Sequence, residues 1–373
     1  MRGYRLELEL VAPVHVGTGE TYPAYAYVPD EERKAVHLLD PGRLLEGLDE
    51  VHQRRYLEAV KTGPKGAQDL LVTWWREGRL PRGAILRTIQ ASKAFFQALK
   101  NAEEGLLEYR PLPASPLGPY LPGSSVKGAL RTAWIFRRIL QKNRDVVWDR
   151  SQWAWGETPE AGNWPLIFPP RTPSDREKTA QSFEAFVLGY LRENKKNPGR
   201  KYLDLYQDPF RAVRVADSGP LESFLNLIKV FPIGKEKGLR ILAETLRIQT
   251  KVTLVLRLEE GLARHSGVSH PITAEELAKA CREYYQEVMA EERKYADQNR
   301  LKNAQELYKK MEERLGQNPQ AFPLRIGFGS GSLSIRLALL MDESPPKTRK
   351  TVGAENPQDG YPLGWALARL SPV

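Results

Sequence analysis

Alternating apolar and polar residues mark several short stretches of the chain, and a period of two predicts β-strands. In residues 4–11, YRLELELV, every second side chain is apolar, and the stretch runs into a glycine-containing turn. Residues 210–216 and 245–258 also alternate, and the second is rich in Val, Thr, Ile and Leu, so we expect two paired strands. Residues 323–331 and 333–340 give two more predicted strands.

Apolar residues three and four positions apart predict helices between these strands. Residues 121–142 form one such helix, for which Ser124 or Ser125 is the expected N-cap. Residues 273–290 form another, with Thr273 as the expected N-cap. The order strand, helix, strand, strand, helix, strand predicts an α+β protein with a ferredoxin-like, RRM-like βαββαβ core.

The predicted core is composite, because long segments separate its elements. These elements lie near residues 4–19, 121–142, 209–218, 244–259, 273–290 and 323–340 of the 1–373 chain. Between them we expect three insertions: a helical one at 41–110, a Trp- and Pro-rich loop with a basic helix at 145–205, and a charged helix at 291–318. The sequence leaves open whether a second ferredoxin-like half exists and which insertion contacts another protein.

Composition and charge narrow the class of partner. The 373 residues include 56 Lys and Arg against 46 Asp and Glu, a formal net charge of +10, which favours an anionic partner such as nucleic acid. No apolar run reaches the roughly 20 residues that span a bilayer, so we expect no membrane partner. A single cysteine, Cys281, excludes an intrachain disulfide and a cysteine-rich zinc site. Together these features predict a cytoplasmic protein.

The beginning of the 121–142 helix combines two serines with basic residues. Lys127 and Arg131 lie four positions apart, so both project from one side of the helix near its N-terminus. Free serine hydroxyls, uncapped amides and the positive end of the helix dipole form a seat for an anion such as phosphate. An ordinary capped helix that packs on the sheet explains the same residues, and both interpretations stay open.

Two nucleotide-binding motifs are excluded by the positions of these residues. Ser124 and Ser125 stand where a P-loop needs Lys followed by Ser or Thr, and Lys127 comes too late. The glycines of residues 327–331 are followed by a predicted strand, whereas a dinucleotide-binding loop opens a helix. A glycine loop between strands suits an RNA backbone instead, because phosphates can approach the main-chain amides.

Three motifs together resemble the RAMP superfamily of CRISPR proteins. They are PVHVGTG at 13–19, LPGSSVKGALRTA at 121–133 and IGFGSG at 326–331. The segment FRAVRVADS at 210–218, and PKTRK at 346–350 with PLGW at 362–365, are most similar to the fifth-Csm-subunit family of type III-A effector complexes. The resemblance spans nearly the whole chain.

The resemblance implies a noncatalytic, crRNA-binding subunit that caps the filament at the 3′ end of the crRNA and aids crRNA maturation and antiviral defence. The implied partners are crRNA, the neighbouring RAMP backbone subunit and the rest of the effector, with target RNA and host nucleases as further candidates. The implied RNA-binding residues are His15, Gly17, Gly19, Ser124, Ser125, Lys127, Arg131, Gly327, Gly329, Ser330, Gly331, Lys347, Arg349 and Lys350.

Catalysis and metal binding find weaker support. His15 has the chemistry of a general base, but a lone histidine beneath a glycine loop is more often structural. His265 and His270 lack a carboxylate or cysteine frame for a metal, and Asp30 is a weak substitute for the catalytic aspartate of the RAMP backbone subunit. We therefore expect no catalytic residue, metal or cofactor. A RAMP endoribonuclease that processes crRNA and the equivalent end subunit of a type III-B (Cmr) complex remain alternatives.

Overall fold

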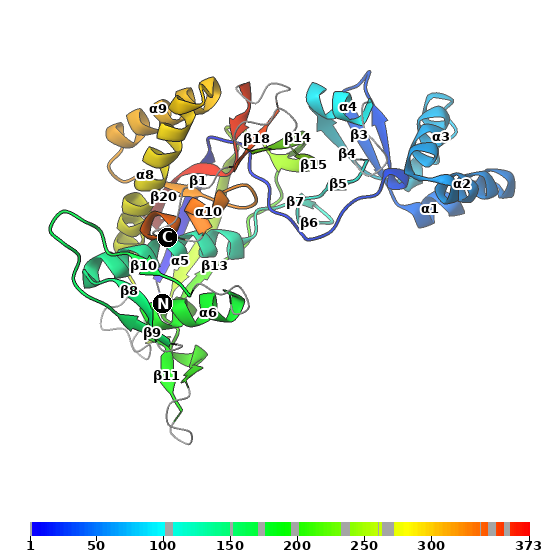
Figure 1. Cartoon of the computed structure of the whole chain (residues 1–373). Helices are drawn as coiled ribbons and strands as arrows, with labels where there is room; N and C mark the ends of the chain where they lie inside the picture. Colours follow the sequence, from blue (N-terminus) through cyan, green and yellow to red (C-terminus); the bar gives the residue numbers. More distant parts are fainter. Residues whose placement is uncertain are drawn as a thin grey trace.

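The computed structural model describes residues 2–100, 107–149, 152–170, 176–194, 201–232, 239–259, 261–262, 272–335, 337–341, 348–353 and 359–373. Figure 1 shows a main body, built around β1, α5, α8 and α9, and a smaller lobe with α1 to α4 that projects from it. No helix in these ranges is long and apolar enough to cross a bilayer. The prediction of an α+β protein is confirmed by this mixture of sheets and helices.

The main body is organised by a five-stranded sheet whose neighbouring strands are all antiparallel. In spatial order its strands are β13 (Val213–Val215), β16 (Lys251–Leu258), β1 (Arg2–Leu10), β20 (Trp365–Pro372) and β17 (Phe322–Arg325). Leu6 of β1 lies opposite Leu254 on one side and Leu370 on the other. The predicted pairing of the 210–216 and 245–258 stretches is confirmed by β13 and β16.

Two helices pack their apolar stripes on this sheet. They are α5 (Gly123–Lys142) and α8 (Ala274–Gln298), and their buried residues join the leucines of β1 in one core. Arg137 of α5 forms ion pairs with Glu276 and Glu283 of α8, which ties the helices together. The helix α9 (Lys302–Gln317) follows α8, so the predicted charged helix at 291–318 comprises the end of α8 and α9.

Two strand predictions in the main body need correction. Residues 333–340 form the helix α10 (Gly331–Ile335) and a short 3-10 turn, η7 (Ala338–Leu340), because their buried leucines at 333, 337 and 340 have helical spacing. The strand beside β1 at this end is β20 instead. The 245–258 stretch is divided, because β15 (Leu239–Leu246) ends before a turn in which Gln249 has φ 67°, and β16 begins after it.

An eight-stranded sheet, which the sequence did not predict, connects the main body to the lobe. Its main path is β19 (Tyr361–Pro362), β18 (Thr348–Val352), β14 (Ser223–Pro232), β4 (Ile85–Ala91), β3 (Ala35–Leu39) and β2 (Tyr27–Asp30). Beside this path, β15 pairs with β14 and with β5 (Tyr109–Arg110). The sheet therefore collects segments from the first third, the middle and the last part of the chain.

The lobe contains the helices α1 (Pro41–Glu46), α2 (Glu50–Thr62), α3 (Pro64–Arg76) and α4 (Lys93–Lys100), with the short turns η1 (Ala24–Ala26) and η2 (Arg82–Ala84). The predicted helical insertion at 41–110 is thus largely helical, but β4 crosses it as a strand. Ile89 and Ala91 are buried on this strand, where they meet Phe95 of α4 in a separate apolar cluster.

The 145–205 segment is more regular than predicted. It forms a three-stranded sheet of β8 (Val146–Asp149), β9 (Gln152–Trp155) and β10 (Ile167–Phe168), followed by α6 (Arg176–Val187) and the hairpin of β11 (Leu191–Glu193) and β12 (Lys201–Leu203). Trp153 packs edge-on against Trp148 and Phe183, so the tryptophans hold the small sheet to the helix. The remaining short elements are β6 (Ala114–Ser115), β7 (Gly118–Pro119), η5 (Leu205–Gln207) and η6 (Pro209–Ala212).

Candidate nucleic-acid interface

The structure brings the glycine loop, residues 327–331, directly onto the loop at 13–19. Gly327 has φ 78°, and a Cβ there would lie 2.3 Å from the carbonyl oxygen of His15. The amide of Phe328 donates a hydrogen bond of 2.8 Å to that same oxygen. Only glycine allows both the backbone conformation and the close approach. Two predicted sites that lie more than 300 residues apart in sequence are therefore one structural unit.

The rest of the glycine loop is held by close packing and by a hydrogen bond within the loop. Gly329 has φ 91°, and a Cβ there would lie 2.7 Å from Leu363, so this residue also packs too closely for a side chain. The hydroxyl of Ser330, which is buried, donates to the carbonyl of Gly327 at 2.6 Å. Gly331 has φ 74° but faces open space. Close packing at Gly329 and the hydrogen bond of Ser330 thus support the shape of the loop.

His15 is completely buried and bonded to the protein backbone. Its Nδ1 lies 2.7 Å from the carbonyl oxygen of Glu244, and because a carbonyl only accepts, Nδ1 carries the proton. Burial lowers the pKa of His15 to about 4, with Arg110 lowering it further and the Glu244 carbonyl opposing this. The imidazole is therefore neutral near pH 7. The exposed residues of this loop are Gly17, Thr18 and Gly19.

Two cations gather around the ring of Phe328. The Nζ of Lys350 lies 3.8 Å from the ring centroid, and the guanidinium carbon of Arg110 lies 5.3 Å from it. His15 meets the same ring edge-on at 5.7 Å. Burial lowers the pKa of Lys350, and the nearby charges of Arg110 and Arg325 add to this effect. We name Arg110, Phe328 and Lys350 the basic–aromatic cluster.

Two members of this cluster, Phe328 and Arg110, were not predicted from the sequence. Phe328 stands between glycines whose spacing drew attention to the backbone alone, and Arg110 lies in β5, far from any motif. An aromatic residue inside a glycine loop was the available signal, since exposed aromatics with cations are typical of single-stranded nucleic-acid binding. For Arg110 the sequence offers no local signal, because only the pairing of β5 with β15 places it here.

The start of α5 is built differently from the prediction. Its N-cap is Pro122, and neither Ser124 nor Ser125 caps the helix, so the predicted serine cap is wrong. The amide of Gly123 instead donates to the carboxylate of Asp217 at 2.8 Å. Gly123 approaches β13 so closely that a Cβ would lie 2.3 Å from the carbonyl oxygen of Val215, which explains why a remote carboxylate reaches this amide.

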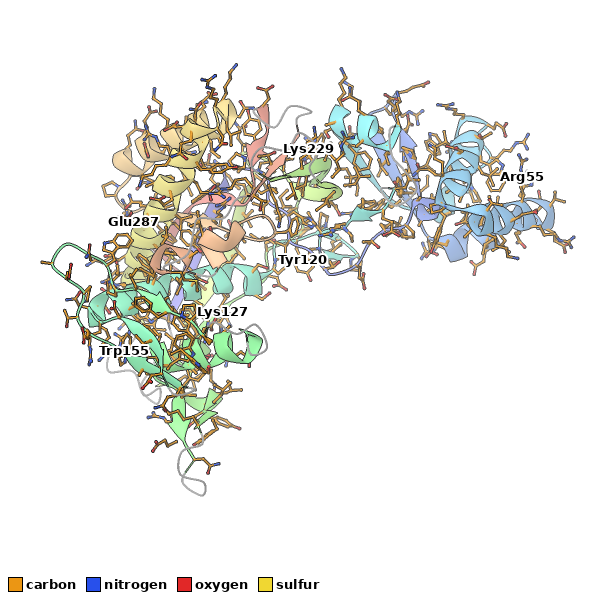
Figure 2. The ribbon with its side chains drawn as sticks, viewed as in Figure 1. Arg55, Tyr120, Lys127, Trp155, Lys229 and Glu287 are labelled. Atoms are coloured by element: carbon orange, nitrogen blue, oxygen red, sulfur yellow. The ribbon has the colours of Figure 1, made fainter. Side chains whose placement is uncertain are left out.

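Arg131 of α5 meets carboxylates of the protein itself. Arg131 forms ion pairs with Glu184 at 2.7 Å and Asp208 at 2.9 Å, and it donates to the hydroxyl of Tyr190. Burial lowers the pKa of Lys127, which Asp208 raises and Arg131 lowers again. Figure 2 places Lys127 in the main body, away from the lobe. The anion that Arg131 requires is therefore supplied within the chain.

The other predicted residues have mixed outcomes. Arg349 pairs with Glu292 at 2.9 Å and lies over Tyr295, whereas Lys347, His265 and His270 lie outside the described residues. Across the described ranges, no group of three or more His, Cys, Asp or Glu is arranged to hold a metal. Asp30 is buried and accepts a hydrogen bond of 3.0 Å from Trp75, so its contacts are structural.

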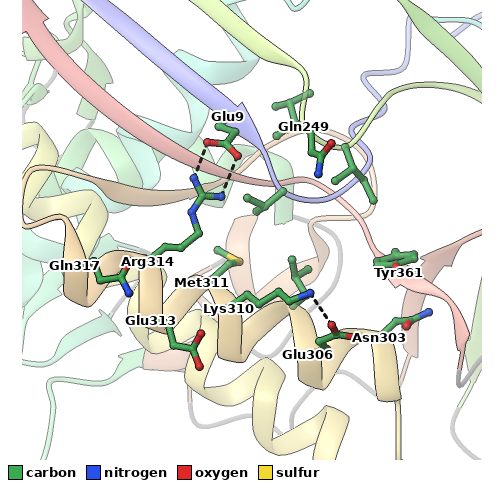
Figure 3. A pocket seen from close by; sticks show the side chains of 14 residues that line it. Glu9, Gln249, Asn303, Glu306, Lys310, Met311, Glu313, Arg314, Gln317 and Tyr361 are labelled. Atoms are coloured by element: carbon green, nitrogen blue, oxygen red, sulfur yellow. Dashed lines mark hydrogen bonds and ion pairs between the residues drawn. The ribbon is translucent and has the colours of Figure 1, made fainter.

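A groove between α9 and the end of β1 gives a contrasting surface (Figure 3). Its volume is 380 Å³, and its floor includes Leu10, Val11 and Met311. One ion pair, Glu9 with Arg314, crosses it, and a second, Glu306 with Lys310, lies along α9 (Figure 3). The charged residues that line it are three carboxylates and two cations: Glu9, Glu306, Glu313, Lys310 and Arg314. This balance does not favour an RNA backbone, unlike the basic–aromatic cluster.

Comparisons with known proteins show which family and which proteins this chain resembles. A family model described as the RAMP superfamily matches residues 7–334. The CRISPR system Cms protein Csm5 of Streptococcus thermophilus is 23% identical over 298 residues, which cover 78% of this chain and 71% of that protein. Its counterpart in Mycobacterium tuberculosis strain H37Rv is 24% identical over 272 residues, covering 68% of this chain and 65% of that protein.

Two solved structures share the fold. One is a chain in the cryo-EM structure of a Csm–crRNA–target RNA ternary complex of a type III-A CRISPR-Cas system, with a TM-score of 0.68 and 18% identity, covering 98% of this chain and 100% of that chain. The other is the crystal structure of T. onnurineus Csm5, also with a TM-score of 0.68, at 20% identity, covering 97% and 99%. The shared fold extends over both the main body and the lobe.

Proposed function

This chain belongs to the RAMP superfamily, and from that premise we propose that it is a crRNA-binding subunit of a type III-A Csm complex. Its similarity to Csm5 proteins of two bacteria and the presence of its fold in a Csm–crRNA complex support this proposal. In that complex it would cap the filament at the 3′ end of the crRNA and contact the neighbouring RAMP backbone subunit. The roles in crRNA maturation and antiviral defence follow from that place.

We also propose that the core of the main body is ferredoxin-like. The spatial order β13, β16, β1, β20, with α5 and α8 on one face, is the order of strands two, three, one and four in that fold. The directions agree, because every neighbouring pair is antiparallel. In this interpretation β17 is an extra edge strand that delivers the glycine loop.

The observation that carries the binding proposal is the meeting of the two loops beside the basic–aromatic cluster. The exposed Gly17 and Gly19 let a backbone approach closely, and Gly327 joins this loop to the glycine loop. Arg110 and Lys350 supply positive charge beside an aromatic ring. A strand that carries phosphates and bases matches this combination of groups.

Binding without cleavage is the chemistry that we propose for this site. His15, the candidate base, is buried and neutral, with Nδ1 bonded to Glu244, so its ring supports the loop from below. The endoribonuclease alternative requires a base that reaches the RNA. Repeat-derived RNA should therefore stay intact with and without Mg²⁺. Sustained cleavage that disappears in His15→Ala would contradict this proposal.

The binding proposal is tested by the salt dependence of crRNA affinity. Arg110→Gln with Lys350→Gln should weaken binding and flatten the slope of log affinity against log salt by about 1.4, since each phosphate contact to a single strand contributes roughly 0.7. Fluorescence anisotropy with labelled crRNA over a range of salt concentrations measures both effects.

A matched control removes the same charge elsewhere. Arg55→Gln with Lys61→Gln acts on α2, and Figure 2 places Arg55 at the far end of the lobe. Both side chains are exposed, so their replacement should leave the fold and the slope unchanged. An equal slope in the two double variants would contradict the basic–aromatic cluster as the RNA contact. Purification of the native assembly, with identification of its subunits, separates a Csm from a Cmr complex.

A further inference from the structure

Glu292, on α8, is a buried carboxylate between two arginines. Its side chain is 5% exposed, and it pairs with Arg325 at 3.2 Å and with Arg349 at 2.9 Å. Burying three charged groups is costly, and an apolar cluster of similar size often gives equal stability. The arrangement is therefore poorly explained by stability alone. What distinguishes it is the pair of segments that it joins.

Arg325 supports the glycine loop from beneath. It is the last residue of β17, and its guanidinium donates to the carbonyl of Gly329 at 3.4 Å and to that of Leu363 at 3.3 Å. It also lies over the ring of Trp365, with 5.1 Å between the guanidinium carbon and the ring centroid. The glycine loop and the turn before β20 are thus fixed to one side chain. Displacing Arg325 would displace the loop.

Arg349 fixes the strand that carries Lys350. Successive side chains of a strand point to opposite faces. On β18, Arg349 points to Glu292 and Tyr295, whereas the next residue, Lys350, lies over Phe328. The contact of Arg349 with Tyr295 is close, at 3.9 Å from the ring centroid. Holding Arg349 against α8 therefore holds Lys350 over Phe328.

We propose that Glu292 is a positioning residue for the RNA site. Through Arg325 it holds the glycine loop of the five-stranded sheet, and through Arg349 it holds the β18 strand of the eight-stranded sheet. The two halves of the basic–aromatic cluster come from different sheets, and Glu292 fixes their separation. This inference rests on the proposed function. Because Glu292 is buried, it acts without touching RNA.

The test compares Glu292→Gln with Glu283→Gln on the same helix. Glu283 also pairs with a buried arginine, Arg137. That arginine lies on α5, whereas Arg325 donates a hydrogen bond to the glycine loop. Glu292→Gln should lower crRNA affinity about tenfold and leave the salt slope unchanged, because every cation remains present. Glu283→Gln should keep wild-type affinity. Amide hydrogen exchange in residues 327–331 of the free protein should accelerate only in Glu292→Gln.

A second variant guards against a general loss of folding. Glu292→Asp keeps the charge but shortens the side chain by one methylene, so both arginines shift while the ion pairs persist. Its thermal midpoint should stay near that of the wild type while its crRNA affinity falls. Equal affinity or equal loop exchange in the Glu292 and Glu283 variants would overturn the inference. A wild-type protein that binds no crRNA would overturn the proposed function, and the inference with it.

Discussion

The start of α5 and the glycine loop look alike in sequence, because each combines glycine and serine with nearby cations. In the structure, carboxylates of the chain lie at the start of α5. Asp217 accepts a hydrogen bond from the amide of Gly123. Glu184 and Asp208 form ion pairs with Arg131. At the glycine loop, Arg110 and Lys350 lie against the ring of Phe328. A basic motif thus indicates an anion, and only the tertiary contacts decide whether the protein itself supplies it.

The largest expected effect that distinguishes the two regions is a loss of stability when Arg131 is replaced. Arg131→Met leaves Asp208 and Glu184 without their cation, and Asp208 is only 17% exposed. We expect the free energy of unfolding to fall by about 3 to 4 kcal/mol, measured by urea denaturation, while the salt slope of crRNA binding stays at its wild-type value. Arg138→Met on the same helix is the control, with little effect on either, because Arg138 donates to the neutral Gln141 of its own helix. A flattened slope in Arg131→Met would erase the contrast.

A smaller effect is expected from protonation of His15, on the glycine-loop side. The folded-state pKa of about 4 lies below the ordinary value of 6.5, so the unfolded chain binds a proton that the folded chain excludes. The stability contribution is complete above pH 6.5 and is lost as the pH falls towards 4, by roughly 3 kcal/mol in all. Urea denaturation at pH 7 and pH 4.5 measures this loss. His15→Gln should remove that part of the pH dependence, and an unchanged profile would show that the loss does not come from protonation of His15.

The smallest expected effect is the difference in stability between two glycine-to-alanine variants of the glycine loop. It distinguishes the cost of close packing from the cost of a positive φ. Gly327→Ala places a methyl group against the carbonyl of His15 and should cost more than about 2 kcal/mol. Gly331→Ala has a similar positive φ in open space and should cost only about 1 kcal/mol. Thermal denaturation of the two variants measures the difference. Equal midpoints would mean that the glycine loop does not pack on the 13–19 loop.

The strands and helices that the sequence predicts are those with one buried face. The strands β1 and β16 alternate clearly, and α5 has a continuous apolar stripe, since each has solvent or a polar neighbour on its other side. All five residues of β3 are buried, so that strand has no alternation to detect. The strand β3 escaped prediction for this reason. The strand β4 does alternate, but it lies inside a segment predicted to be helical, and its partner β14 comes from a distant part of the chain.

The residues of the candidate site also fall into two groups, those that local sequence motifs predict and those that only the tertiary structure places. His15 and the glycines form local motifs whose conformational demands are visible in the sequence, and the structure brings them together. The cap of α5 comes from Asp217, which accepts a hydrogen bond from the amide of Gly123, 94 residues away in sequence. No local rule selects Asp217 over Ser124 or Ser125. Glu292 and Arg110 also lie outside the local sequence of the loop that they help to build. Their roles depend on tertiary pairing.

The position of β1 in the middle of its sheet has a consequence for biosynthesis. Its neighbours are β16 and β20, so the ribosome makes this strand long before either partner exists. The lobe, by contrast, has an apolar cluster drawn from residues 28–84, and it can close while translation continues. Contacts of such long sequence separation slow folding. One edge of β1 therefore stays unpaired in the nascent chain until β20 has left the ribosome tunnel, and a chaperone that shields this edge would raise the yield of folded protein.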